Sequence, residues 1–138
     1  MEQARKILYA GGYTCVLRKD DTVLTATERG VKPLVRWLTE GIDVRGFSAA
    51  DKVVGRATAY LYVLLGVKEV WAAVMSEAAA EVLRRHGIAA SQDKRVKNII
   101  NRAGTGICPF EEAVLKIQTP EEALTAIREK MASMGITL

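Results

Sequence analysis

The chain has 138 residues, 49% of them hydrophobic and 26% charged, with a formal net charge of +4. This size and balance are typical of one globular domain over residues 1–138, and no tract is long and apolar enough to cross a bilayer. The first residues, MEQARKILYA, have charges where a signal peptide needs an apolar core. We therefore expect a cytoplasmic protein without membrane association. Cys15 and Cys108 lie far apart in the chain, which predicts two free thiols.

The first 41 residues predict a helix, a hairpin and a second helix. Residues 2–10 place their apolar side chains on one helical face, and two glycines follow. The stretch YTCVLRKDDTVLTAT has a period of two before KDD and β-branched residues after it, which predicts a hairpin with Cys15 in its first strand. In VKPLVRWLTEG the apolar residues recur at helical spacing until Gly41.

The stretch FSAADKVVGRATAYLYVLLG, residues 47–66, is apolar almost all round. Ser48 and Asp51 at its start have the spacing of a variant capping box, and Gly66 stands at the C-terminal stop position. We therefore predict one central buried helix over this stretch.

The second half of the chain predicts two more strands and three more helices. KEVWAAVM and IAASQ are expected strands on either side of a helix over residues 77–86, which Ser76 caps, and VKNII fits a strand or a short helix. Prolines after Cys108 and Thr119 predict closing helices over about residues 109–118 and 120–134. This order predicts an α/β domain with a mixed sheet flanked by helices.

The stretches ADKVVGRATAYLYVLLGVKEVWAAVMSEAA and IINRAGTGICPFE resemble the small bacterial proteins grouped as domain-of-unknown-function family 1893. The resemblance covers nearly the whole chain. It implies a cytidine-deaminase-like fold, a three-layer arrangement with a mixed sheet between helices. It also implies one pocket at the starts of two helices, bordered by the glycine-rich segment before Cys108.

Working deaminases hold zinc through one His or Cys and two further Cys, and use a Glu to move protons. By the resemblance, the corresponding positions here read SAADKVVG and VMSEAA, and neither keeps its metal ligands. His86, Cys15 and Cys108 do not have the spacing of a metal site. We therefore expect neither a zinc deaminase nor a cofactor.

The resemblance brings three groups of polar residues to the shared pocket as candidate ligand-binding residues. They are Asp51 and Lys52 from the first helix start, Ser76 and Glu77 from the second, and Asn101, Arg102, Thr105, Cys108 and Glu111 from the last segment. Structural roles stay open beside this reading: Asp51 as a capping carboxylate, Lys52 as a solvated neighbour, and Glu77 as an acid favoured by a helix dipole.

Arg56 lies within a predicted helix that is apolar on nearly every side. A buried guanidinium must be paired or bind an anion. We predict that Arg56 is buried and paired with Asp51 or Glu111.

The segment INRAGTGICPFEEAV admits two interpretations of its polar residues. RAGTG could present backbone amides, Thr105 and the Arg102 fork to a phosphate or carboxylate, or its glycines could simply form a tight turn. Cys108 could be a thiolate nucleophile at a helix start, although Glu111 opposes its ionisation. We favour Cys108 as the cap of the helix that begins at Pro109.

These residues predict a binding domain for a small anionic metabolite, nucleotide-like by analogy of fold, with catalysis left open. The alternative is a noncatalytic protein-interaction or structural domain with a decayed pocket. The basic groups RRHG and KRVKN fit an anionic partner or a solvated face. No aromatic residues alternate with these cations, so nucleic acid is not an expected partner, and a homo-oligomer is left open.

Overall fold

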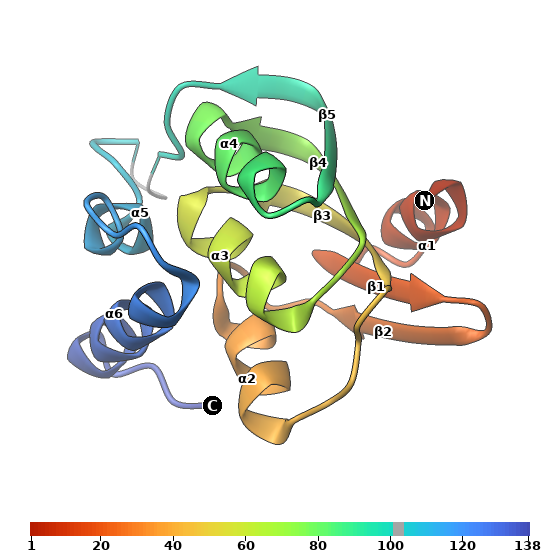
Figure 1. Ribbon diagram of the computed structural model, residues 1–138, viewed down its shortest axis with the longest axis horizontal. Coiled ribbons are helices and arrows are strands. Elements are labelled where there is room, and N and C mark those ends of the chain that lie inside the picture. The colour runs from red at the N-terminus through yellow and green to blue at the C-terminus, as the bar shows by residue number, and fades with distance from the viewer. Residues whose placement is uncertain (101–103) are drawn as a thin grey trace.

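A mixed β-sheet forms the centre of the molecule, whose computed structural model describes residues 1–100 and 104–138 (Figure 1). The strands are β1 (Cys15–Lys19), β2 (Thr22–Ala26), β3 (Ser48–Val54), β4 (Glu69–Ser76) and β5 (Ala89–Val96). Their spatial order is β2-β1-β3-β4-β5, with β1 antiparallel to both of its neighbours and β3, β4 and β5 parallel. The expected α/β class with a mixed sheet is therefore confirmed.

Helices cover the two faces of the sheet unequally (Figure 1). The helices are α1 (Glu2–Ala10), α2 (Lys32–Glu40), α3 (Arg56–Leu65), α4 (Glu77–Arg85), α5 (Pro109–Ala113) and α6 (Pro120–Ser133). α1 packs on one face, against β1 and β3, and the helices from α2 onward lie on the other side. There α3 contacts α2, α4, α5 and α6, so α5 and α6 form an outer layer beyond α3.

Two hydrophobic clusters share the sheet. The larger cluster fills the space between the sheet and helices α2 to α6, and includes the fully buried rings of Tyr60 and Tyr62. The smaller cluster lies under α1 and includes the buried side chains of Leu8 and Trp71. Because the strands contribute side chains to both clusters, the sheet couples α1 to the rest of the fold.

Residues 47–66 form a strand and a helix, not the one helix that we predicted. β3 ends at Val54, Gly55 has an extended backbone with φ −101° and ψ −176°, and α3 begins at Arg56. β3 lies between two other strands, and most of its residues are buried. Such a strand has a continuous apolar run, which periodicity alone does not separate from a buried helix. Ser48 and Asp51 therefore form no capping box.

Most other element ends agree with the sequence pattern to within one or two residues. The predicted cap of α4 is present, and α6 is capped in the same way, since the hydroxyl oxygens of Ser76 and Thr119 accept hydrogen bonds from backbone N–H groups at 3.1 and 3.3 Å. α5 ends at Ala113 instead of near residue 118. β5 continues to Val96, so only the first residue of VKNII belongs to the sheet. In the described part of the chain, no helix is long and apolar enough to cross a membrane.

Candidate anion site at the start of α3

The start of α3 holds a carboxylate from a distant part of the chain. Glu111, on α5, accepts hydrogen bonds from the backbone N–H groups of Arg56 (2.6 Å) and Ala57 (2.8 Å). These two amides are among the donors that the first turn of a helix leaves without an intrahelical partner. Gly55, at the N-cap position, has no side chain to satisfy them. Glu111 therefore caps α3 from a distance of 55 residues in sequence.

Gly55 leaves the space that the Glu111 carboxylate occupies at the start of α3. A Cβ atom at residue 55 would overlap the Glu111 carboxylate. Its backbone is extended, so a larger residue would not be strained by its φ angle but would displace the end of the Glu111 side chain. We define the amide cradle as Gly55 together with the N–H groups of Arg56 and Ala57.

Two opposite electrostatic effects act on the pKa of Glu111 in the amide cradle. Burial raises the pKa of Glu111, while hydrogen bonds from the Ala57 and Arg56 amides and the positive charge of Arg56 lower it. The net effect is a raised pKa. The cradle thus stabilises an anion that would otherwise be costly to bury, as helix N-termini do for carboxylates and phosphates.

Arg56 is half-buried and does not form the carboxylate pair that we predicted. Its Nη2 donates to the Tyr60 hydroxyl at 3.3 Å and to the Ile117 carbonyl at 2.5 Å. Glu111 binds the backbone of Arg56 and not its guanidinium, because α3 begins at Arg56 and points that amide at α5. Asp51 lies within β3 and has other partners.

The second predicted helix start lies at the same edge of the sheet. Val54 pairs with Met75 near the ends of β3 and β4, so α3 and α4 begin side by side. Ser76 is 1% exposed and its Oγ accepts from Ala79, while Glu77 is exposed in the first turn of α4. The Ser76 hydroxyl thus caps α4, and Glu77 lies exposed beside it at this edge of the sheet.

Residues 3–131 match the family described as a domain of unknown function, DUF1893, or TM1506. The chain belongs to the DUF1893 family. A crystal structure of a DUF1893 family protein, TM1506 from Thermotoga maritima, has a TM-score of 0.86 and 26% sequence identity, and the similarity covers 94% of this chain and 88% of that one. No curated protein sequence matches the chain. The family predicted from the sequence is therefore confirmed, and its cytidine-deaminase-like character stays a prediction.

Asp51 and Lys52 do not lie together at a helix start, where we predicted them. They are neighbours within β3, which places their side chains on opposite faces of the sheet. Asp51, 8% exposed, accepts from the Tyr62 hydroxyl on α3 at 2.6 Å, and Cys15 of β1 lies 3.0 Å from the same hydroxyl. Lys52 lies on the α1 side of this DUF1893 domain, with Nζ 4.7 Å from the centre of the Tyr9 ring. Burial raises the pKa of Asp51 to about 6, and also raises that of Cys15.

The glycine-rich segment of the DUF1893 domain is described only from residue 104. Asn101 and Arg102 lie outside the described residues. Thr105 is exposed, and Gly104 has a φ of +71°, which suits glycine. Cys108 occupies the N-cap position of α5, as predicted, but its half-buried thiol makes no capping hydrogen bond. No three His, Cys, Asp or Glu side chains in the described ranges are grouped to hold a metal ion.

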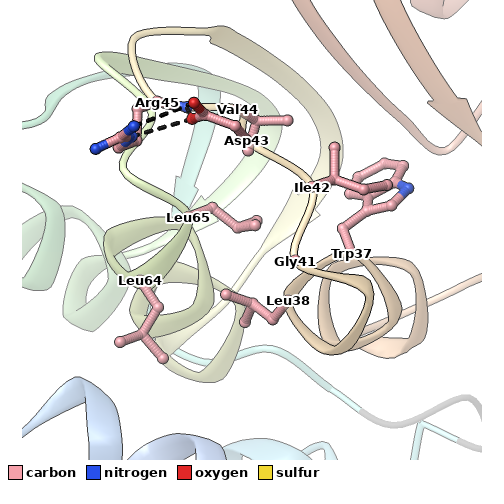
Figure 2. Close-up of a pocket in the computed structure, with 9 residues that line it drawn as sticks. All are labelled: Trp37, Leu38, Gly41, Ile42, Asp43, Val44, Arg45, Leu64 and Leu65. Atoms are coloured by element: carbon pink, nitrogen blue, oxygen red, sulfur yellow. Dashed lines mark hydrogen bonds and ion pairs between the residues drawn. The ribbon is translucent and has the colours of Figure 1, made fainter.

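A shallow hollow lies at the other end of α3 (Figure 2). Leu38 at the end of α2 faces Leu64 and Leu65 at the end of α3, and the Asp43–Arg45 ion pair lies at the rim. This hollow is distant from the amide cradle along α3, because the cradle is at its first residues. None of the predicted site residues lines it.

Sequence reasoning missed Gly55 and Tyr62 as parts of these sites. The signal for Gly55 was its position between a β-branched run and the Ala-rich and Tyr-rich stretch that follows. No local signal identifies Tyr62, because its partners Asp51 and Cys15 reach it from two strands.

Proposed function

We propose that this DUF1893 domain binds a small anionic metabolite at the amide cradle, with Glu111 as the internal occupant that the ligand displaces. The observation that carries the proposal is the Glu111 carboxylate on the amides of Arg56 and Ala57 at 2.6 and 2.8 Å. An anion of similar size with its own phosphate or carboxylate group would use the same donors.

The proposal includes the features expected from the sequence beyond the family and fold class. These are a cytidine-deaminase-like architecture, a nucleotide-like ligand by analogy of fold, and a bacterial cytoplasmic setting. Catalysis is not part of the proposal, because neither Cys108 nor Glu77 has a hydrogen-bonded base or acid beside its side chain among the described residues.

Displacement of Glu111 is chemically reasonable because burial raises its pKa. Burial disfavours the ionised carboxylate, and this cost is relieved when Glu111 moves into solvent and a phosphate takes its place on the amides. The ligand therefore competes with a carboxylate whose burial is unfavourable in free energy.

The test is thermal melting of the wild-type chain and of Glu111→Ala with nucleoside monophosphates, nucleosides and acetate. Phosphate-bearing compounds should raise the midpoint by mass action, and uncharged nucleosides should not. The rise should be larger in Glu111→Ala, and acetate should partly restore its stability, because the internal competitor is gone.

Glu112→Ala is the matched control, since Glu112 is the exposed neighbour on α5 and its side chain forms no hydrogen bond or ion pair among the described residues. It should behave like the wild-type chain. If no anion stabilises either the wild type or Glu111→Ala, the noncatalytic interaction domain is the better function.

A further inference from the structure

Two arginines from different helices meet at one buried hydroxyl. Arg56 at the start of α3 and Arg85 at the end of α4 place their Nη2 atoms 3.3 and 3.4 Å from the Tyr60 hydroxyl oxygen. Tyr60 donates its own proton to the Ile117 carbonyl at 2.9 Å, so its oxygen is free to accept from both guanidinium groups. Arg85 also lies 3.5 Å from the Gln118 side-chain oxygen. We call Arg56, Arg85 and Tyr60 the arginine pair site.

Among the described residues, neither arginine of this site forms an ion pair, although the Arg56 charge acts on the Glu111 carboxylate from a greater distance. Across residues 1–100 and 104–138, no carboxylate oxygen lies within 4.0 Å of either guanidinium. Other cations of the chain do have such partners, for example Arg36 with Glu28 at 2.6 Å. The hydrogen-bond acceptors at the arginine pair site are all neutral oxygens, so neither guanidinium is bonded directly to a counter-charge.

Several N–H donors of the two guanidinium groups also have no hydrogen-bond partner among the described residues. Arg56 Nε is buried without a hydrogen-bond partner, and in the described chain no other buried side-chain nitrogen or oxygen atom lacks one. Arg56 Nη1 and Arg85 Nε make no hydrogen bond to the described residues. Arg85 is exposed, so the site is accessible from solvent on its α4 side.

We infer that Arg56 and Arg85 together bind a phosphoryl group, either inorganic phosphate or the phosphate of an ester. A doubly charged phosphate offsets both cations, and its oxygens match the planar forks of two guanidinium groups. Tyr60 positions the two arginines by accepting from both. The inference goes beyond the proposed function, because this site uses side-chain cations and includes Arg85, whereas the amide cradle uses backbone donors.

The experiment is calorimetric titration of inorganic phosphate at constant ionic strength into the wild type, Arg85→Gln and Arg84→Gln. Arg84 is the adjacent exposed cation of α4, and its side chain forms no hydrogen bond or ion pair in the described chain, so its variant loses the same charge without losing such a partner. Arg85→Gln should weaken phosphate binding at least about tenfold, as loss of a charge-assisted hydrogen bond predicts. Arg84→Gln should bind as the wild type does.

A nucleoside monophosphate titrated beside its nucleoside separates the two phosphate sources. If the ester is the ligand, the monophosphate binds more tightly than inorganic phosphate and still depends on Arg85. Equal weakening in Arg84→Gln and Arg85→Gln, or no saturable binding by the wild type, would overturn the inference. Restoration of Glu111→Ala by acetate tests the amide cradle separately, so each proposal can fail alone.

Discussion

Asp51 shows at the residue scale how one buried carboxylate makes stability depend on pH. It accepts hydrogen bonds from Tyr62 at 2.6 Å and from the Val53 amide at 3.2 Å, yet burial dominates and raises its pKa to about 6. A carboxyl group whose pKa is higher in the folded state than in the unfolded chain binds its proton more tightly when folded. Its contribution is therefore fully present below the unfolded pKa, about 3.9, and is lost as the pH rises through 6.

We predict that Asp51→Asn removes this dependence. The free energy of unfolding of the wild type, minus that of Asp51→Asn, should fall by about 2 kcal/mol between pH 4 and pH 7. Urea denaturation of both proteins across this range measures the difference. Asp93→Asn is the control, because the side chain of Asp93 is 61% exposed. A difference for Asp51→Asn that stays constant with pH would contradict the burial argument.

At the scale of elements, α3 and α4 begin at one edge of the sheet but are capped in different ways. α4 is capped locally, by the Oγ of Ser76, and α3 is capped from α5 by Glu111. The local cap was predictable because Ser precedes a helical pattern directly, whereas the remote cap depends on where α5 packs. The Ser76 cap therefore connects only neighbouring residues of the chain, whereas the Glu111 cap connects α5 to the start of α3.

We predict that Ser76→Ala destabilises the domain by about 1–2 kcal/mol, because the buried Ala79 amide loses its acceptor where water cannot replace it. Thr119→Ala is the matched control. Its capped amide, at Glu122, lies on the exposed start of α6 and can bind water, so the loss should be smaller. Thermal or urea unfolding measures both changes, and an equal loss in the two variants would be the contrary result.

For the whole molecule, the unequal covering of the sheet raises the question of whether α1 unfolds separately. Leu8 and Ala4 attach α1 to a small cluster with Val16, Ala50 and Trp71, and Arg5 lies 4.2 Å over the Trp71 ring. β1, β3 and β4, which supply the last three apolar residues, also contribute to the larger cluster. Shared strands predict one cooperative transition.

We predict that Leu8→Ala lowers the free energy of unfolding by about 2–5 kcal/mol without separating the transition into two steps. Tryptophan fluorescence measures this, since Trp37 belongs to the larger cluster and Trp71 to the smaller one. Trp37→Phe and Trp71→Phe backgrounds let each cluster be followed alone. An earlier midpoint for Trp71 than for Trp37 would mean that α1 is an independent unit.

The amino-acid pattern by itself determined most elements of this domain, because their signals are local. The hairpin around KDD, the helices ended by Gly41 and begun by Ser76 and Thr119, and the strand of KEVWAAVM follow from period, caps and turns within a few residues. The same pattern carried the resemblance to the DUF1893 family.

Only the tertiary structure decided where β3 ends and α3 begins, and which side chains share a site. β3 has an apolar run like that of a buried helix, and its strand character comes from pairing with β1 and β4. Glu111 reaches α3 across 55 residues, and Arg85 meets Tyr60 across 25. Such contacts depend on how helices pack on the sheet, which local periodicity does not encode.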